Sequence, residues 1–258
     1  MPSILYEVRG EIAHVTLNGG EALNLLNTAV IQRLLKVVND ISDNPQVRVV
    51  IISGAGNRAF CAGADVKEAA YQSPTEIVRF KNMLGELCYG IEALPQPTIA
   101  AINGFAFGAG LELALACDLR IAVDQTLLGL PETKLGLIPG AGGTQRLPRL
   151  IGESKAMELI LTAKRITSLE AYQYGLVSKV VSNNKLEEEA IDIANEILGN
   201  APTAVCQAKF AVKNGLKTDL ESGLKLEKIA LLKTVNTHDR EIGLQAFLEK
   251  KRPRFTGK

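Results

Sequence analysis

The chain has 258 residues, of which 47% are hydrophobic and 22% are charged. This composition is ordinary for a soluble globular protein, and the length suits one large domain or two small ones with a sizeable core. The formal net charge of +1 gives no general case for binding nucleic acid or a membrane surface. No uninterrupted apolar stretch approaches the roughly 20 residues of a membrane-spanning helix.

The N-terminal segment and the cysteines lead us to expect a cytoplasmic protein. The first 18 residues lack the basic and apolar segments of a signal peptide, and they lack the acid-free, Arg- and Ser-rich character of a transit peptide. Four cysteines are scattered without a C-x-x-C pair, and the two histidines show no metal-ligand spacing. We therefore expect reduced thiols and no metal.

The predicted elements begin with a β-hairpin and a helix. Apolar and polar residues alternate on both sides of residues 9–11, a pattern typical of two antiparallel strands. Apolar residues recur with helical spacing over 28–42, where Thr28 is the expected N-cap. The β-branched, fully apolar run at 47–53 predicts a strand buried within a sheet.

Strand, glycine-rich loop and helix then recur along the chain. Residues 54–65 are expected to form a loop, and a helix follows Pro74 and ends before Leu94. A second buried strand is expected at 98–102, followed by a glycine-rich loop at 103–110, the helix LELALAC and the strand DLRIAV. This repetition predicts an α/β fold.

The strand signal nearly disappears after about residue 150, where only VSKVV remains before a series of predicted helices. The last 58 residues contain 12 Lys or Arg against 6 Asp or Glu, whereas residues 1–200 contain 17 against 22. We predict an α/β core over residues 1–195 and a helical region over residues 196–258. The excess of basic residues is either a solvated surface or one that meets a neighbouring subunit or an anionic ligand.

The stretch VVIISGAGNRA contains G-x-G-x-x-A after a predicted strand, as a dinucleotide-binding fold would. That fingerprint opens directly into a helix, whereas residues 58–63 are expected to continue as loop, so the match is weak. P-loop and G-x-S-x-G motifs are absent, and two histidines give little support for a Ser-His or Cys-His nucleophile.

Glu112 lies within GAGLELALACD, where the surrounding residues predict a buried helix. Burying an unpaired carboxylate is costly or raises its pKa, which suits an acid that transfers protons near neutrality. The preceding glycines leave first-turn N–H groups free to stabilise a developing negative charge. The alternative is that Glu112 only stabilises the helix N-terminus through the dipole.

Glu132 is a second acid among apolar residues, in LLGLPETKLGLIPGAGGTQRLPRLIG. Its ordinary interpretation is an acid near a helix start, with Pro131 at the first position. Two such acids could manage addition of water across a double bond, one positioning the water and the other moving the proton.

Three segments together resemble the enoyl-CoA hydratase (crotonase) family: AFCAGADVKE, NGFAFGAGLELALACDLRIA and LPETKLGLIPGAGGTQRLPRLIG. The resemblance runs nearly the full length, and GLELALACD and LPETKLG are especially similar to methylglutaconyl-CoA hydratases. It implies a crotonase-like spiral core of repeated ββα turns and a C-terminal helical region that forms trimers, commonly paired as hexamers.

The resemblance also implies roles for single residues. Glu112 and Glu132 match the two catalytic glutamates, and Ala64 and Ala109 match the two oxyanion-hole N–H donors. Five further residues match positions that contact the CoA of the substrate: Ala62, Asp65, Val66, Phe247 and Lys250. The last two are on the C-terminal helix, which in the family often reaches a neighbouring subunit's CoA.

Two departures from the family pattern stand out. Many members have Gly where this chain has Ala109, a change that keeps the backbone N–H donor. Residues 18–24 read NGGEALN, without the Arg and Pro that often precede the ALN, which puts a local CoA contact and the rigidity of that loop in doubt.

The resemblance implies an enoyl-CoA hydratase that converts a 2-enoyl-CoA into a 3-hydroxyacyl-CoA in fatty-acid or branched-chain amino-acid breakdown. No metal or redox cofactor is expected, since CoA arrives with the substrate. The alternatives are a methylglutaconyl-CoA hydratase specifically, or an enoyl-CoA isomerase, which needs only one carboxylate. RNA binding through the basic run at 250–254 is an alternative of a different class, although such runs are usually solvated.

Overall fold

The structure is a computed structural model, and it describes residues 3–19, 23–69 and 71–258, with only the backbone described for Val66 and Ala69. Part of the atypical segment at 18–24, residues 20–22, therefore lies outside the described residues. No helix in the described ranges is both long and apolar enough to cross a membrane.

The main sheet has six strands in the order β1-β2-β3-β5-β7-β10. The β1–β2 pair is the predicted hairpin, and every other pairing in this sheet is parallel. Its strands are β1 (Ile4–Arg9), β2 (Ile12–Leu17), β3 (Val49–Gly54), β5 (Thr98–Ile102), β7 (Leu119–Val123) and β10 (Lys179–Val181). The parallel order confirms the predicted α/β class.

A second, four-stranded sheet corrects the predicted loops. Its order is β4-β6-β8-β9, and each strand has three residues: β4 (Ala59–Cys61), β6 (Phe105–Phe107), β8 (Leu127–Gly129) and β9 (Arg165–Thr167). The loops expected at 54–65 and 103–110 were thus partly wrong, because β4 and β6 lie within them. Strand β9 was missed because three residues are too few to show alternation.

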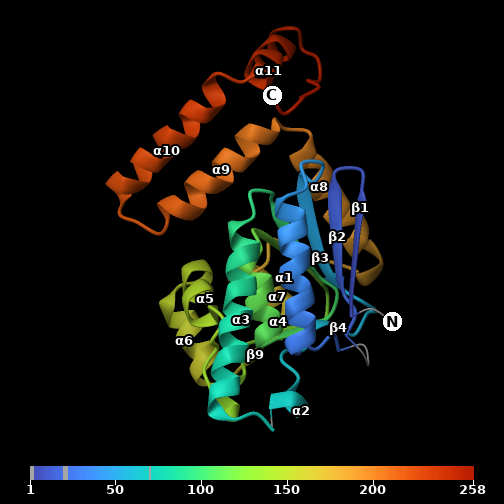
Figure 1. The fold of residues 1–258 in the computed structure, drawn as a ribbon, viewed down its shortest axis with the longest axis vertical. Coiled ribbons are helices and arrows are strands. Elements are labelled where there is room, and N and C mark those ends of the chain that lie inside the picture. Colours follow the sequence, from blue (N-terminus) through green and yellow to red (C-terminus); the bar gives the residue numbers. More distant parts are fainter. Residues whose placement is uncertain (1–2, 20–22, 70) are drawn as a thin grey trace.

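Helices cover both faces of the main sheet (Figure 1). One face packs on α1 (Thr28–Ser42), α3 (Pro74–Ala93) and α4 (Ala109–Ala116), and the other packs on α8 (Leu186–Leu198). Successive residues of β3 alternate between the two cores: Val50 and Ile52 belong to the first, Val49 and Ile51 to the second. This explains why the strand is apolar throughout.

A side-chain hydrogen bond caps the N-terminus of α1. Asn27 is the N-cap of α1 and accepts a hydrogen bond from the Val30 N–H at 2.9 Å, so the expected cap at Thr28 was one residue late. The remaining helices before residue 200 are α2 (Val66–Ala69), η1 (Glu132–Leu135), α5 (Gly143–Ile151), α6 (Glu153–Leu161), α7 (Ser168–Gln173) and η2 (Asn183–Lys185).

The C-terminal helices extend away from the core (Figure 1). They are α9 (Pro202–Gly215), α10 (Leu220–Val235) and α11 (His238–Leu248). Helices α9 and α10 pack against each other, and Gly223 closely approaches Gly215 near their connection. Large apolar side chains on α10 and just after α9 are exposed: Leu216, Leu220, Leu224, Leu231 and Leu232.

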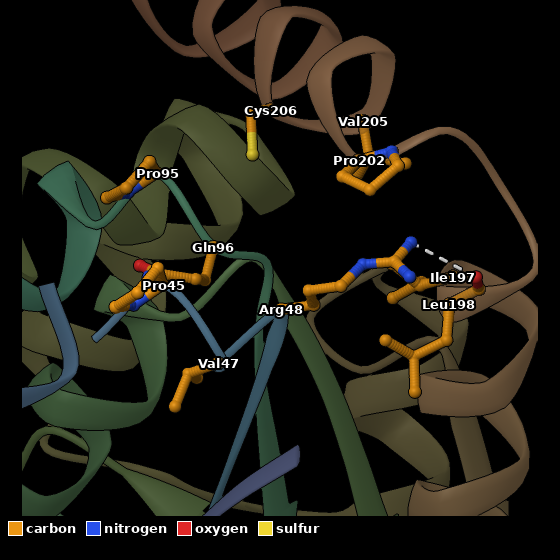
Figure 2. Close-up of a pocket in the computed structure, with 10 residues that line it drawn as sticks. All are labelled: Pro45, Val47, Arg48, Pro95, Gln96, Ile197, Leu198, Pro202, Val205 and Cys206. Atoms are coloured by element: carbon orange, nitrogen blue, oxygen red, sulfur yellow. Dashed lines mark hydrogen bonds between the residues drawn. The ribbon is translucent and has the colours of Figure 1, made fainter. Parts of the chain in front are cut away.

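A crevice separates α9 from the end of the core (Figure 2). Arg48 lies beneath the helix and donates hydrogen bonds to the Leu198 carbonyl at 3.1 Å and the Asn200 carbonyl at 2.8 Å. Cys206 of α9 faces the same crevice. The boundary expected between residues 195 and 196 falls in the last turn of α8, and the division into core and oligomerisation region stays a prediction.

Candidate active site

Glu112 lies in α4, where every residue is buried, and its side chain is 0% exposed. Its Oε1 accepts hydrogen bonds from the Ala141 N–H at 2.7 Å and the Gly143 N–H at 2.9 Å. Its Oε2 has no hydrogen-bond partner in the described structure. The glycine-rich loop before α5 therefore supplies the hydrogen-bond donors that allow this carboxylate to be buried within an apolar helix.

Glu132 begins η1 and is 6% exposed. Neither carboxyl oxygen has a hydrogen-bond partner among the described residues. Burial, followed by the charge of Glu112, raises the pKa of Glu132 to about 7. A group that titrates near neutrality can both give and take a proton at physiological pH.

Gly108 brings the two carboxylates to the same place. Its carbonyl accepts the Glu112 N–H at 2.9 Å, and a Cβ added at Gly108 would lie 3.0 Å from Oε1 of Glu132. Gly108 also has φ +51°, a left-handed conformation that glycine adopts without strain. The predicted pair is therefore assembled across the N-terminus of α4.

The first predicted oxyanion donor, Ala64, forms an isolated parallel bridge with Leu26. Leu26 donates to the Gly63 carbonyl at 2.9 Å and accepts from the Asp65 N–H at 2.8 Å. The N–H of Ala64 lies between these two bonds, so it points away from Leu26 and is not used by the bridge.

The second predicted donor, Ala109, is the first residue of α4. Its N–H belongs to the first helical turn, whose donors have no intrahelical acceptor, and the N-cap Gly108 provides no side-chain cap. A free N–H at a helix N-terminus favours developing negative charge. The roles of Ala64 and Ala109 as an oxyanion hole stay predictions that this geometry allows.

Three residues predicted to contact CoA are close to Ala64 in the chain. The Ala62 N–H is bonded to the Leu23 carbonyl at 2.9 Å, and Oδ1 of Asp65 accepts the Lys67 N–H at 2.9 Å at the start of α2. Val66 is the first residue of α2, and its side chain lies outside the described part. Asp65 therefore has a structural role whether or not it contacts a ligand.

Phe247 and Lys250 are not brought to the glutamate pair within one chain. Phe247 is 81% exposed on α11, and Lys250 follows that helix in a left-handed conformation with φ +55°. Figure 1 places α11 at the far end of the C-terminal helices, remote from α4. Phe247 and Lys250 therefore do not reach a CoA bound at the glutamate pair of their own chain.

Two cations near the pair were missed by sequence reasoning. The Lys81 Nζ on α3 lies 4.0 Å from Glu112 Oε2, and the Lys81 side chain is 19% exposed. Arg146 on α5 donates to Glu92 Oε2 at 2.9 and 2.6 Å and to the Ala141 carbonyl at 2.9 Å. Arg146 thus holds the loop whose N–H groups bind Glu112.

The site contains groups for proton transfer and none of the donor sets that hold a metal. Among residues 3–19, 23–69 and 71–258, no three His, Cys, Asp or Glu side chains gather as metal ligands would. The crevice of Figure 2 contains none of the predicted site residues. Paired buried carboxylates beside a helix N-terminus can perform acid–base chemistry on a carbonyl compound.

Comparison with known proteins agrees with that class. The family model for enoyl-CoA hydratase/isomerase matches residues 7–258. The chain is 49% identical to YngF of Bacillus subtilis, with 99% of this chain and 98% of YngF covered. It is 40% identical to the short-chain-enoyl-CoA hydratase of Clostridium acetobutylicum (97% and 96% covered), and 44% identical to human mitochondrial methylglutaconyl-CoA hydratase (97% and 75% covered).

A crystal structure of an enoyl-CoA hydratase from Bacillus anthracis has the same fold, with a TM-score of 0.97, 47% identity and 100% of both chains covered. The chain belongs to the enoyl-CoA hydratase/isomerase family. The family resemblance and the crotonase-like fold expected from the sequence are therefore confirmed.

Proposed function

We propose that the protein is an enoyl-CoA hydratase that adds water across the 2,3 double bond of a 2-enoyl-CoA. The observation that carries this proposal is the pair of buried glutamates, which have three carboxyl oxygens without donors and lie beside the N-terminus of α4. Buried polar atoms almost always have partners, so three such acceptors together mark a place where water or substrate binds.

In the proposed reaction, the thioester carbonyl oxygen binds between the N–H groups of Ala64 and Ala109. One water is held by Glu112 and Glu132; its oxygen bonds to C3 and one of its protons passes to Glu112. Glu132 gives a proton to C2 as the C2–C3 double bond becomes single, and the product is a 3-hydroxyacyl-CoA. Transfer of the proton from Glu112 back to Glu132 restores the starting state. The Oε2 of Glu112 has no partner among the described residues and can accept the proton, and the pKa of Glu132 near 7 suits it to donate.

The proposed chemistry needs no metal or redox cofactor, because the oxyanion donors and the two carboxylates supply the charge stabilisation and the protons. CoA belongs to the substrate. We assign its contacts to Ala62, Asp65 and Val66 of the same chain.

We further propose a trimer, or a hexamer of two trimers, in which Phe247 and Lys250 contact the CoA of a neighbouring subunit. The exposed leucines of α10, together with Leu216 just after α9, support this assembly, because extensive exposed apolar surfaces are rare on soluble monomers. The position of α11, far from its own chain's α4, also fits a contact between subunits (Figure 1).

The acyl group of the substrate has two candidates. The similarity to the Clostridium enzyme favours short straight chains, whereas the similarity to human methylglutaconyl-CoA hydratase favours a branched, carboxylate-bearing chain. An isomerase needs one proton-carrying carboxylate, so two buried glutamates favour the hydratase over it.

The test is a hydration assay of the purified protein with crotonyl-, hexenoyl-, decenoyl- and 3-methylglutaconyl-CoA, repeated with Glu112→Gln and Glu132→Gln. Gln keeps the size and hydrogen bonding of Glu but cannot transfer the proton. We expect each variant to lose a factor on the order of 10²–10⁴ in kcat while binding acyl-CoA, and the double variant to be little worse than the poorer single one.

Unequal losses, with one variant inactive and the other fully active in double-bond migration, would instead identify an isomerase. Normal turnover in both variants would contradict the two-carboxylate mechanism. If the protein binds RNA with nanomolar affinity that weakens steeply with salt, and shows no hydratase turnover, RNA binding would replace hydration as the favoured function.

A further inference from the structure

Lys81 is a half-buried cation within the proposed site, and the proposed reaction does not use it. It follows the buried Phe80 on α3, and its aliphatic stem passes the backbone of Gly140: a Cβ added there would lie 3.3 Å from the Lys81 Cδ. The ammonium group ends 4.0 Å from Oε2 of Glu112. Gly140 therefore makes room for this side chain to reach the pair.

The ammonium group of Lys81 donates no hydrogen bond to any described residue, since its only ionic contact, with Glu112, is beyond hydrogen-bond distance. Lys209 and Lys213, which are also largely buried, differ: their Nζ atoms lie 2.6 and 3.1 Å from Asp118 carboxyl oxygens. Lys81 thus keeps its donors close to the unpartnered Oε2 of Glu112.

The other ionisable groups around the pair cannot act as its counter-charge. Arg146, from α5, is committed to Glu92 of α3 at 2.6 Å. Cys88, also on α3, interacts with Glu112, but burial raises the pKa of its thiol well above the usual range, so it stays neutral. Within the described structure, Lys81 is the cation that acts on Glu132, where its charge opposes the effect of Glu112.

We propose that Lys81 is a positioning residue that supplies the counter-charge of the catalytic pair and limits the pH range over which Glu132 keeps its proton. The proposal rests on the proposed hydratase function, and it assigns to Lys81 no contact with CoA. Two carboxylates at close range without a cation resist losing their last proton, because the second negative charge is repelled by the first.

Removing the charge of Lys81 should change the pH dependence of the reaction rate. Glu132 must be protonated to deliver its proton to C2, so the alkaline limb of the pH–rate profile follows its proton loss. Removing the positive charge of Lys81 removes an influence that lowers the pKa of Glu132. The alkaline limb should then move to higher pH, by up to about one unit, because the charge of Lys81 is the smallest of the influences on the pKa of Glu132.

The experiment compares Lys81→Met, which keeps the length of the stem but not the charge, with the wild type and with Lys81→Arg. Both kcat and KM are measured from pH 5 to 10 with the best substrate of the panel. We expect Lys81→Met to shift the alkaline limb upward by up to about one pH unit with less than about a twofold change in KM, and Lys81→Arg to keep the limb at its wild-type position.

Lys134→Met is the matched control, because it removes the same charge from an exposed position two residues after Glu132. It should leave the limb where it is. An unmoved limb in a folded, active Lys81→Met variant would overturn the proposal. A raised KM with an unchanged pH profile would also overturn it, and would assign Lys81 to substrate binding.

A second readout separates this proposal from the function itself. Carbon-13 NMR of Glu side-chain carboxyls, with the Glu132 signal assigned through Glu132→Gln, follows the titration of Glu132 without turnover. Absence of hydration in the wild type would refute the proposed function alone. An unchanged Glu132 titration in Lys81→Met would refute the role of Lys81, whatever the activity.

Discussion

The Nζ of Lys209 lies 2.6 Å from Oδ2 of Asp118, which joins α9 to the chain just after α4. Asp118 also accepts the N–H and the hydroxyl of Thr98, at 2.8 and 3.0 Å, and pairs with Lys213 at 3.1 Å. Asp118, two residues beyond the end of α4, is therefore one of the groups that hold the C-terminal region against the core, together with the Gln96 carbonyl, which accepts from Lys209 at 2.8 Å.

Lys209→Met should lower the free energy of unfolding by about 1–3 kcal/mol. Breaking a buried ion pair typically costs more, but Lys213 and Thr98 remain to satisfy Asp118. Urea denaturation measures the change. Lys225→Met is the control, because its pair with Glu221 is exposed and should contribute less than about 0.5 kcal/mol. Equal effects of the two substitutions would contradict this role for Lys209.

Arg146→Gln should impair catalysis without unfolding the protein. It removes the bonds to Glu92 and to the Ala141 carbonyl, so the loop that donates to Glu112 loses its anchor. We expect kcat to fall by roughly 10- to 100-fold, since small displacements of catalytic groups have effects of this size, with KM little changed. Steady-state kinetics measure both; an unchanged kcat would show that the loop holds Glu112 without Arg146.

Glu132→Gln should stabilise the protein in a pH-dependent way. The folded-state pKa of Glu132, about 7, lies above the ordinary value of 4.5, so its protonated form favours folding. That contribution is complete below pH 4.5 and is lost as the pH rises through 7. The stability of the variant relative to wild type should therefore rise by up to about 3 kcal/mol between pH 4.5 and 8. Denaturation at pH 5 and pH 8 measures this; a constant difference would contradict the raised pKa.

Gly110→Ala should destabilise the core by more than about 3 kcal/mol, because the added Cβ would lie 2.1 Å from the Cys61 carbonyl oxygen. Gly85→Ala is the matched control, since nothing lies within 4 Å of its Cβ in the interior of α3. That change should stabilise the protein by about 0.5–1 kcal/mol. Thermal unfolding distinguishes the two; equal melting temperatures would show that α4 can move away from β4.

Assembly should be visible in sedimentation at micromolar concentration. We expect a trimer or hexamer in place of the 27.7 kDa monomer. Replacing the exposed Leu224, Leu231 and Leu232 with Glu should shift the population toward monomers, because charge in an apolar contact is unfavourable. A wild-type chain that sediments only as a monomer would refute the proposed assembly.

The sequence predicted the long elements well and the short ones poorly. The helix at 28–42 and the strand at 98–102 match the structure residue for residue, because each is long enough to show its periodicity or a continuous apolar run. Strand β9, Arg165–Thr167, depends on pairing with β8, a contact between distant segments that no local pattern records.

The same limit applies to the site. Glu112 and Glu132 could be found because a carboxylate among apolar residues is locally unusual. Lys81 and Arg146 could not, since a cation on an amphipathic helix is ordinary. Their significance depends on tertiary neighbours: Gly140 beside the stem of Lys81, and the Ala141 carbonyl beside Arg146.

The crevice beneath α9 contains a cysteine through which the C-terminal region can be labelled. Cys61 and Cys117 are fully buried, and burial raises the pKa of each thiol to about 12; Cys88 is buried as well. Alkylating reagents require an accessible thiolate, which leaves the half-buried Cys206 as the thiol to label in the native protein. A fluorophore or spin label there would sit where α9 meets the core, and would report on the packing between them.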